Sequence, residues 1–431
     1  MLIPYDQLLK ETVALRRDFH KYPESGWMEF RTTAKIAETL SAFDYKLLFP
    51  CDFINKEDIM GRVSEEKVRK AEERAEIQGA DKKILKRMNG MTGLVAELDT
   101  GRQGPVTVLR FDIDCVDIAE TGDTCHIPNR LGFASQNNNC MHSCGHDGHV
   151  AIGLVLAEIM AKEKNKLCGT VRFIFQPAEE GVRGGYAMVK SGIADDADYF
   201  IAMHLGLGLP TGTVCCGAGG FLLTTKFDAE LKGVAAHAAK EPEKGRNALL
   251  AAASAAIAIH RMPKCQYGKA MANVGVLTAG VGRNVIAPNA LMKIETRGEN
   301  EKSASFAYNY CIKSLREAAE SSGVKIIISK QGESIAADSD AVFSGIISRC
   351  ASSVPGVREC LINCKLSVSD DACWYMKRVQ SNNGKVSYVC FGADITAGHH
   401  SDRFDFDESA MVIAVDVLEK VVSELNKFTA F

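Results

Sequence analysis

The pattern that most constrains the fold is a series of short apolar segments that alternate with helical segments. Residues 93–98, 106–111, 171–175 and 199–203 are apolar runs with many β-branched residues, as in buried strands. Between or before them, residues 149–161, 185–190 and the first 45 residues have the spacing of apolar side chains that is typical of helices. Strands that alternate with helices predict an α/β fold with a mostly parallel sheet, covered by helices on both faces.

The pattern changes after residue 220. The expected elements are strands at 224–231, 272–277, 290–296 and 324–329, and helices at 245–261 and 302–321. This βαββαβ order is typical of a ferredoxin-like unit with an antiparallel sheet. Because the α/β pattern resumes at residues 341–351, 386–391 and 411–425, the unit reads as an insertion. We therefore expect a discontinuous catalytic, metal-binding domain at 1–220 and 332–431, and an inserted lid or dimerisation domain at 221–331.

The composition excludes several classes of protein. The chain has 431 residues with 51 basic and 54 acidic side chains, a net charge of -3, so no basic surface for nucleic acid or an anionic membrane is expected. The longest apolar stretch, residues 248–259, is shorter than the roughly 20 residues that span a bilayer, and it is interpreted as a buried helix. Residues 56–87 carry both charge signs densely, as a solvated helical insertion would.

The N-terminus and the cysteines favour a reducing compartment. Charged residues within the first 11 positions break the apolar core that an export signal needs, so a cytoplasmic location is expected. The 15 cysteines include no CxxC pair, and most are expected to be free thiols. Metal or redox chemistry is conceivable for the adjacent Cys215 and Cys216 and for Cys360 and Cys364. With no histidine nearby, they are interpreted as small buried apolar side chains.

Four segments concentrate residues that bind metals or work beside them. They are MHSCGHDGH at 141–149, QPAEEG at 176–181, AMHLG at 202–206 and GHHSDRFDFDE at 398–408. Most of them follow a predicted strand or lie in a loop before a helix. Open α/β sheets bind their ligands at the carboxyl ends of the strands, so these segments are expected to meet.

The residue types in these segments suit two cations. Cys144 and His146 can face one point from the turn that opens a helix. Glu179 and Glu180 follow a strand, where neighbouring side chains point opposite ways, so one could bind metal while the other faces the substrate. Taken singly, His204 could be a core residue and the two glutamates could be surface residues. Together with His400, the set of thiolate, carboxylate and imidazoles favours zinc, manganese or cobalt over magnesium or calcium.

Longer motifs resemble a known family. They are LRRDFHKYPE, MHSCGHDGH, FQPAEEG, AMHLG, GVAAHAAKEPEKGRNAL and HHSDRFDFDE. These motifs are similar to those of the amidohydrolase branch of the carboxypeptidase-G and aminoacylase metallopeptidases, and the resemblance covers essentially the whole chain. It implies that the metal ligands are Cys144, His146, Glu180, His204 and His400, with Glu179 as the catalytic base and with His237, Asn284 and Arg297 on the lid. The choice of His400 over its neighbour His399 stays open.

One position departs from the pattern of some relatives. Where those relatives have an HxD metal motif, this chain has Asp112, Ile113 and Asp114. The histidine ligand is therefore absent, and Cys144 is expected to supply the bridging ligand. Asp114 is expected to lie behind the ligands and support them.

The reaction implied is hydrolysis of the amide bond of an N-acyl or N-aroyl amino acid, foremost p-aminobenzoyl-glutamate, with two divalent cations, manganese or zinc. His237 would donate to the oxyanion and Arg297 would bind the substrate carboxylate. A second substrate carboxylate would need another cation, for which Arg183, Arg246 and Arg283 are unranked candidates. The expected assembly is a homodimer or a pair with a homologous subunit. Two alternatives remain: an aminoacylase or dipeptidase with the same metal chemistry, and a non-catalytic subunit that binds ligand.

Overall fold

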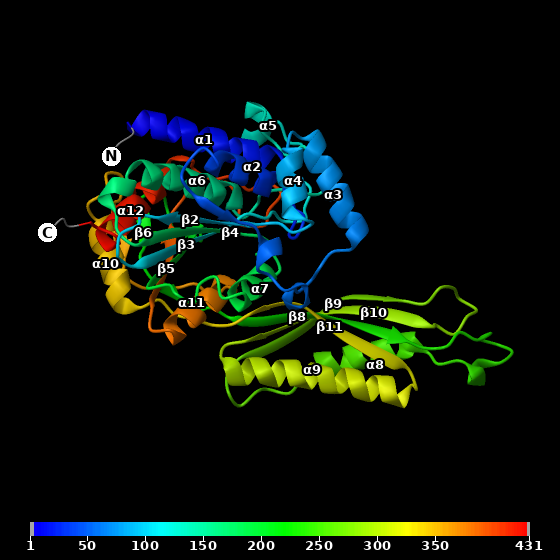
Figure 1. The fold of residues 1–431 in the computed structure, drawn as a ribbon. Coiled ribbons are helices and arrows are strands. Elements are labelled where there is room, and N and C mark those ends of the chain that lie inside the picture. The colour runs from blue at the N-terminus through cyan, green and yellow to red at the C-terminus, as the bar shows by residue number, and fades with distance from the viewer. Residues whose placement is uncertain (1–3, 429–431) are drawn as a thin grey trace. The chain divides into compact units, whose positions relative to one another are not determined.

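A computed structural model describes residues 4–428 and divides into two compact units (Figure 1). The first comprises the chain up to Gly220, Ala337–Leu366 and the chain from Asp371 onward. The second comprises Phe221–Ala336 and Ser367–Asp370. Each unit has its own cluster of buried apolar side chains.

The first unit is built on an eight-stranded sheet with the strand order β1-β2-β4-β3-β5-β14-β6-β12. Its strands are β1 (Lys46–Leu48), β2 (Leu94–Asp99), β3 (Val106–Asp112), β4 (Thr170–Gln176), β5 (Tyr199–Leu205), β6 (Thr213–Cys215), β12 (Glu359–Leu361) and β14 (Lys385–Phe391). The four central strands β4, β3, β5 and β14 are parallel. Because helices bury both faces of such strands, their sequences are continuous apolar runs, as in Thr170–Gln176.

Helices cover both faces of this sheet (Figure 1). They are α1 (Tyr5–Lys21), α2 (Phe30–Leu40), α3 (Glu65–Ile77), α4 (Lys82–Met88), α5 (Ile127–Leu131), α6 (His146–Lys162), α7 (Gly184–Lys190), α10 (Ala341–Ala351), α11 (Ala372–Ser381) and α12 (Ser409–Leu425). The central helix α6 packs against α1, α12, β3 and β4, which explains why it is apolar on nearly all sides. The charged insertion forms α3 and α4, so the helical prediction for residues 56–87 is confirmed in that part.

The second unit is a four-stranded antiparallel sheet with two helices. Its elements are β8 (Leu223–Lys232), α8 (Ala248–His260), β9 (Ala270–Ala279), β10 (Asn289–Gly298), α9 (Glu301–Ser321) and β11 (Lys325–Ser334). The strand order β11-β8-β10-β9 is the ferredoxin-like order that the βαββαβ pattern predicts. The α/β fold class with an inserted βαββαβ unit is therefore confirmed.

One helix of the second unit is less buried than the sequence suggests. The small residues of α8, such as Ala251 and Ala255, are fully buried, but Leu250 and Ile257 on its other side are 60% and 55% exposed. The interpretation of residues 248–259 as a buried helix is wrong for this second face. An all-apolar segment hides the difference, because periodicity cannot separate a packed side from an exposed one.

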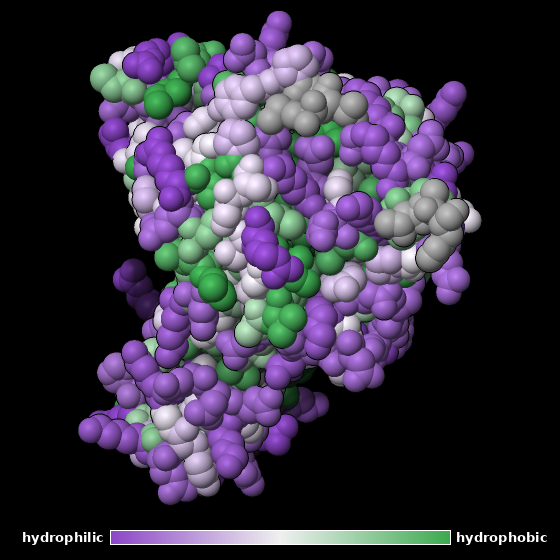
Figure 2. Space-filling view, turned by 90° about the vertical axis from the view of Figure 1, so that its left-hand side faces the viewer, coloured by the Kyte–Doolittle hydropathy of each residue, from purple (hydrophilic) through white to green (hydrophobic). Residues whose placement is uncertain are grey.

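The surface is mixed in character. Figure 2 shows hydrophilic side chains over most of the face in view, with smaller apolar areas between them. Among the helices of residues 4–428, none combines the length and the apolar character that crossing a bilayer requires.

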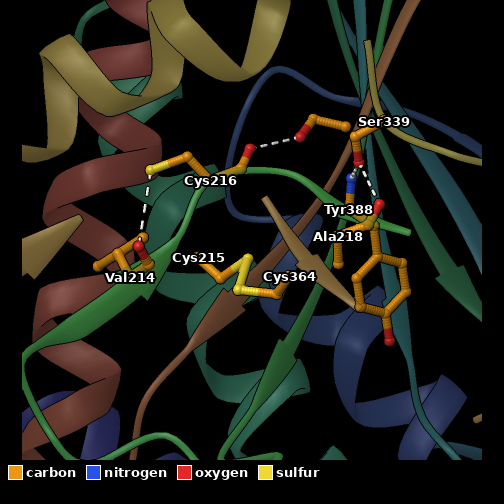
Figure 3. Close-up of a disulfide and its surroundings, with 8 residues drawn as sticks. Val214, Cys215, Cys216, Ala218, Ser339, Cys364 and Tyr388 are labelled. Atoms are coloured by element: carbon orange, nitrogen blue, oxygen red, sulfur yellow. Dashed lines mark hydrogen bonds between the residues drawn. A yellow bond between two sulfur atoms is a disulfide. The ribbon is translucent and has the colours of Figure 1, made fainter. Parts of the chain in front are cut away.

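The structure joins Cys215 and Cys364 in a disulfide, with Cα atoms 6.2 Å apart. The bond links β6 to the short strand β13 (Cys364–Lys365), which pairs with β7 (Ala218–Gly219) (Figure 3). Cys216 remains a buried free thiol whose Sγ lies 3.7 Å from the carbonyl oxygen of Val214. The interpretation of Cys215 and Cys364 as unpaired apolar side chains is wrong, although 13 of the cysteines are free thiols as expected.

Candidate metal centre

The candidate site lies where the parallel strands of the first unit end. The neighbouring strands β4, β3 and β5 end at Gln176, Asp112 and Leu205, and β14 lies beside β5. Since parallel strands share one carboxyl edge, the segments that follow them meet there. The four polar segments identified in the sequence thus belong to one edge of one sheet.

The turn before α6 presents Cys144 and His146. Gly145, the N-cap of α6, has φ 92°, in the left-handed region that glycine adopts without strain. His146 is the first residue of the helix and is 1% exposed. The glycine therefore lets the chain reverse between the two residues, so that both side chains come to one place.

Hydrogen bonds fix the ring orientation of two histidines. Nδ1 of His146 bonds to the main-chain oxygen of Asp114 at 2.9 Å, and Nδ1 of His204 bonds to the main-chain oxygen of Leu205 at 2.7 Å. Because a carbonyl only accepts, each Nδ1 carries the proton and each Nε2 is left as a lone-pair donor for a cation. Nε2 of His204 lies 3.5 Å from Cys144 Sγ, and Nε2 of His146 has no hydrogen-bond partner within residues 4–428.

Glu179 and Glu180 lie in a turn rather than in extended backbone. Strand β4 ends at Gln176, and Ala178 has φ 55°. The prediction that the two carboxylates point opposite ways, as in a strand, is therefore wrong. Ligand atoms of Glu179, Glu180 and His146 lie within 4.8 Å of one another, so both carboxylates face the same place.

Asp114 holds this turn from behind. Its Oδ1 accepts the main-chain N–H of Glu179 at 2.9 Å, and its Oδ2 accepts that of Glu180 at 3.0 Å. The side chain is fully buried. Both carboxylate oxygens are thus occupied by amides, which suits a residue that positions the turn.

The adjacent histidines His399 and His400 differ in their contacts. Nε2 of His399 accepts the main-chain N–H of Leu207 at 3.2 Å, so its Nδ1 carries the proton, and Nδ1 lies 3.7 Å from Cys144 Sγ. Nε2 of His400 lies 3.4 Å from Glu180 Oε1. His399 is therefore arranged to donate a hydrogen bond to a thiolate, whereas His400 has a nitrogen directed at the glutamate.

These side chains form two groups of potential ligands that share one sulfur. The ligand atoms of Cys144, His146 and His204 lie within 4.8 Å of one another, and so do those of Cys144, Glu180 and His400. Burial and the carboxylate of Glu180 raise the pKa of the Cys144 thiol, so a thiolate here requires positive charge beside it. Two three-ligand groups, a shared sulfur and the unpartnered Nε2 of His146 together fit a pair of cations.

A neighbouring group of potential ligands fits a cation less well. Nδ1 of His149 donates to Asp112 Oδ1 at 2.5 Å, and Nε2 of His149 accepts the main-chain N–H of Leu205 at 3.0 Å. Asp112 also pairs with Arg110 at 2.6 Å. Because both ring nitrogens of His149 are in use, the role of this pair is structural support beneath the site.

Sequence reasoning missed Glu29. Its Oε1 accepts the main-chain N–H of Ala178 at 2.8 Å, and its Oε2 accepts the hydroxyl of Thr92 at 2.6 Å. Burial, with a further contribution from Asp114, raises the pKa of Glu29 to about 8. Glu29 and Asp114 thus hold three consecutive amides of the turn that carries the two glutamates.

The other predicted site residues, His237, Asn284 and Arg297, belong to the second unit. Nδ1 of His237 accepts the N–H groups of Ala239 and Lys240, both at 3.2 Å, which places the ring proton on the exposed side at Nε2. The main-chain oxygen of Asn284 accepts the N–H of Ala238 at 3.1 Å, so the two loops are neighbours. Arg297, on β10, pairs with Glu295 at 3.1 Å.

Comparison with known proteins agrees with this geometry. Residues 108–424 match the family model of the peptidase family M20/M25/M40. The chain is 46% identical to indole-3-acetyl-aspartic acid hydrolase of Enterobacter agglomerans, over 96% of this chain and 95% of that protein. It is 44% identical to a subunit of the p-aminobenzoyl-glutamate hydrolase of Escherichia coli (strain K12), over 94% and 93%. A crystal structure of the aminobenzoyl-glutamate utilization protein from Klebsiella pneumoniae superimposes with a TM-score of 0.84 at 39% identity, over 97% of each chain.

Proposed function

Because this chain belongs to the peptidase family M20/M25/M40 and is a metal-dependent hydrolase of amide bonds, we propose that its substrates are aromatic acyl conjugates of acidic amino acids. The foremost substrate in this proposal is p-aminobenzoyl-glutamate, cleaved to p-aminobenzoate and glutamate. Further motifs of the sequence, among them GMTGLVAELDTG at 90–101 and GRNV at 282–285, resemble the p-aminobenzoyl-glutamate hydrolase in particular.

The observation that carries the proposal is the pair of ligand groups that share Cys144. We assign His146 and His204 to one divalent cation, Glu180 and His400 to a second, and the Cys144 thiolate to both. Imidazole and thiolate ligands favour manganese or zinc. The bound cations would lower the pKa of a shared water from ~15.7 towards ~7 and polarise the substrate carbonyl.

The remaining residues act on protons, charge and substrate position. Glu179 takes the proton of the attacking water and passes it to the leaving nitrogen. Nε2–H of His237 donates to the oxyanion, Asn284 supports that loop, and Arg297 exchanges Glu295 for the α-carboxylate of the substrate. In the proposed assembly His237 comes from a partner subunit, either in a homodimer or in a pair with a homologous chain.

A second substrate is supported by the relative that is 46% identical. That protein is named an indole-3-acetyl-aspartic acid hydrolase. Its named substrate and p-aminobenzoyl-glutamate both join an aromatic acyl group to an amino acid with a second carboxylate. The shared chemistry, rather than either compound, defines the substrate class that we propose.

The test is product identification combined with metal analysis. Purified protein loaded with Mn²⁺ or Zn²⁺ is given p-aminobenzoyl-glutamate, indole-3-acetyl-aspartate, simple N-acetyl amino acids and dipeptides. We expect kcat/KM to be highest for the two aromatic conjugates. Faster turnover of N-acetyl amino acids or dipeptides would indicate an aminoacylase or dipeptidase instead, and no turnover of any would favour a subunit that only binds ligand.

A further inference from the structure

We propose that Arg183 determines substrate specificity by binding the side-chain carboxylate of the acidic amino acid. This inference rests on the proposed function and extends it from the metal centre to the part of the substrate that distinguishes glutamate from glutamine. Of the three arginines that the sequence offers for a second carboxylate, Arg246 and Arg283 belong to the second unit. Arg183 belongs to the unit that holds the metal ligands.

Arg183 is fixed to the turn that carries Glu179 and Glu180. Its Nε donates to the main-chain oxygen of Glu180 at 3.0 Å, and its main-chain N–H donates to the oxygen of Ala178 at 3.0 Å. The guanidinium is therefore attached directly to the backbone of a proposed metal ligand. Since Asp114 and Glu29 hold the same turn from behind, the position of the guanidinium relative to that ligand is defined before any substrate binds.

The neighbouring loop leaves room for this side chain at Gly26. A Cβ atom added to Gly26 would lie 2.3 Å from Nη2 of Arg183, closer than any side chain allows. The backbone of Gly26 does not have a positive φ, so its conformation does not require glycine. What requires glycine there is the space that the end of Arg183 occupies.

The outer nitrogens of Arg183 are available. Within the part of the chain that the structure describes, its Nη1 and Nη2 make no hydrogen bond or ion pair, and only Nε is used. Other arginines of the same unit, such as Arg110, Arg172 and Arg378, each pair with a carboxylate.

The acidic side chains around the turn do not take up this charge. Asp114 is occupied by the amides of Glu179 and Glu180, and Glu29 by the amide of Ala178. A planar fork of uncommitted donors matches both oxygens of a carboxylate, which an amide side chain such as that of glutamine cannot offer.

The experiment compares p-aminobenzoyl-glutamate with p-aminobenzoyl-glutamine in the metal-loaded enzyme. In Arg183→Met, kcat/KM for the glutamate conjugate is expected to fall ~100-fold or more, and that for the glutamine conjugate by less than ~3-fold. Arg183→Lys should keep part of the preference, because it keeps the charge but not the fork. Gly26→Ala, which displaces the guanidinium, should reproduce the selective loss.

Arg378→Met serves as the matched control, because Arg378 pairs with Asp195 and both side chains are well exposed. It should leave both kcat/KM values unchanged. Equal loss of activity on both conjugates in Arg183→Met would overturn the proposal and assign Arg183 a structural role. An unchanged preference for glutamate would overturn it as well.

A binding measurement separates this inference from the proposed function. If the wild type hydrolyses neither conjugate, the proposed function fails, and calorimetric binding of free glutamate and glutamine to the Mn²⁺-loaded protein then decides the role of Arg183. Glutamate that binds more tightly than glutamine in the wild type but not in Arg183→Met supports the specificity role. Equal binding of the two amino acids by the wild type contradicts it.

Discussion

The carboxylate of Glu29 accepts the main-chain N–H of Ala178 at 2.8 Å, although the two residues are 149 positions apart in the chain. Ala178 has a positive φ, which costs free energy for a residue with a side chain. The hydrogen bond stabilises this conformation at the start of the turn that carries Glu179 and Glu180. The N-terminal segment is therefore part of the machinery that sets the geometry of the site.

The role of Glu29 predicts a difference between two substitutions. The raised pKa of about 8 means that the side chain is protonated at pH 7, so Glu29→Gln resembles the native state and keeps an acceptor for Ala178. We expect kcat within ~3-fold of the wild type for Glu29→Gln, and roughly 10- to 100-fold lower for Glu29→Ala. Steady-state kinetics checks this, and equal kcat values for the two variants would contradict the positioning role.

The two adjacent glutamates should differ in what their loss removes. Glu179→Gln keeps the shape but removes the proton acceptor, so metal should stay bound while kcat falls ~100-fold or more. Glu180→Gln should lose metal, because it removes a charged ligand. Metal analysis of both variants alongside kinetics measures this, and the reverse pattern would exchange the two roles.

The buried network at the start of α6 predicts a pH-dependent stability. Although burial raises it, Arg16 and His20 hold the pKa of Asp147 well below its usual range. A depressed carboxyl pKa contributes stability that is present above the unfolded-state pKa of ~3.9 and is lost as the pH falls below it. Asp147→Asn should lower the free energy of unfolding at pH 7 by about 3 to 5 kcal/mol, because it leaves Arg16 a buried cation with fewer partners.

This prediction is checked by urea unfolding at several pH values. The difference between wild type and Asp147→Asn should shrink as the pH falls below ~4, where Asp147 begins to lose its charge in the unfolded state. Asp195→Asn is the control, since its exposed pair with Arg378 should contribute less than about 1 kcal/mol. A constant difference at all pH values would show that the charge of Asp147 is not the cause.

The disulfide predicts a thiol count. Of 15 cysteines, two are joined, so 15 - 2 = 13 thiols should react in denaturant without reductant, and 15 after reduction. The bond closes a loop of 149 residues that contains the second unit, and the loop-entropy estimate for its stabilisation is at most about 5 kcal/mol. Cys364→Ser should lower the Tm, whereas Cys125→Ser, at an exposed free thiol, should not. Fifteen reactive thiols without reduction would exclude the bond.

The fold is readable from the sequence because its elements are strongly patterned. The strands of the parallel sheet are buried on both faces, so segments such as Thr170–Gln176 are continuous apolar runs. The metal-centre segments stand out because His204 and the two glutamates end or follow such runs. Their meeting point follows from the rule that parallel strands share one carboxyl edge.

The details that the sequence does not predict depend on contacts between distant residues. Nothing near Glu29 indicates that its partner is Ala178, and Cys215 and Cys364 lie far apart without a recognisable spacing. The turn before Glu179 escapes prediction because alanine is not a residue type that signals a positive φ. His399 and His400 are adjacent, and only the hydrogen bond from Leu207 to His399 distinguishes them.

The most direct test of the account is the metal content of Cys144→Ser, since Cys144 joins both ligand groups. After loading with Mn²⁺ or Zn²⁺ and removal of free ions, elemental analysis should find two ions per chain in the wild type. In Cys144→Ser we expect fewer than one ion per chain, together with loss of amide hydrolysis, because serine does not readily form the anion that bridges two cations. Two ions per chain and unchanged hydrolysis in Cys144→Ser would contradict a metal centre built around this thiolate.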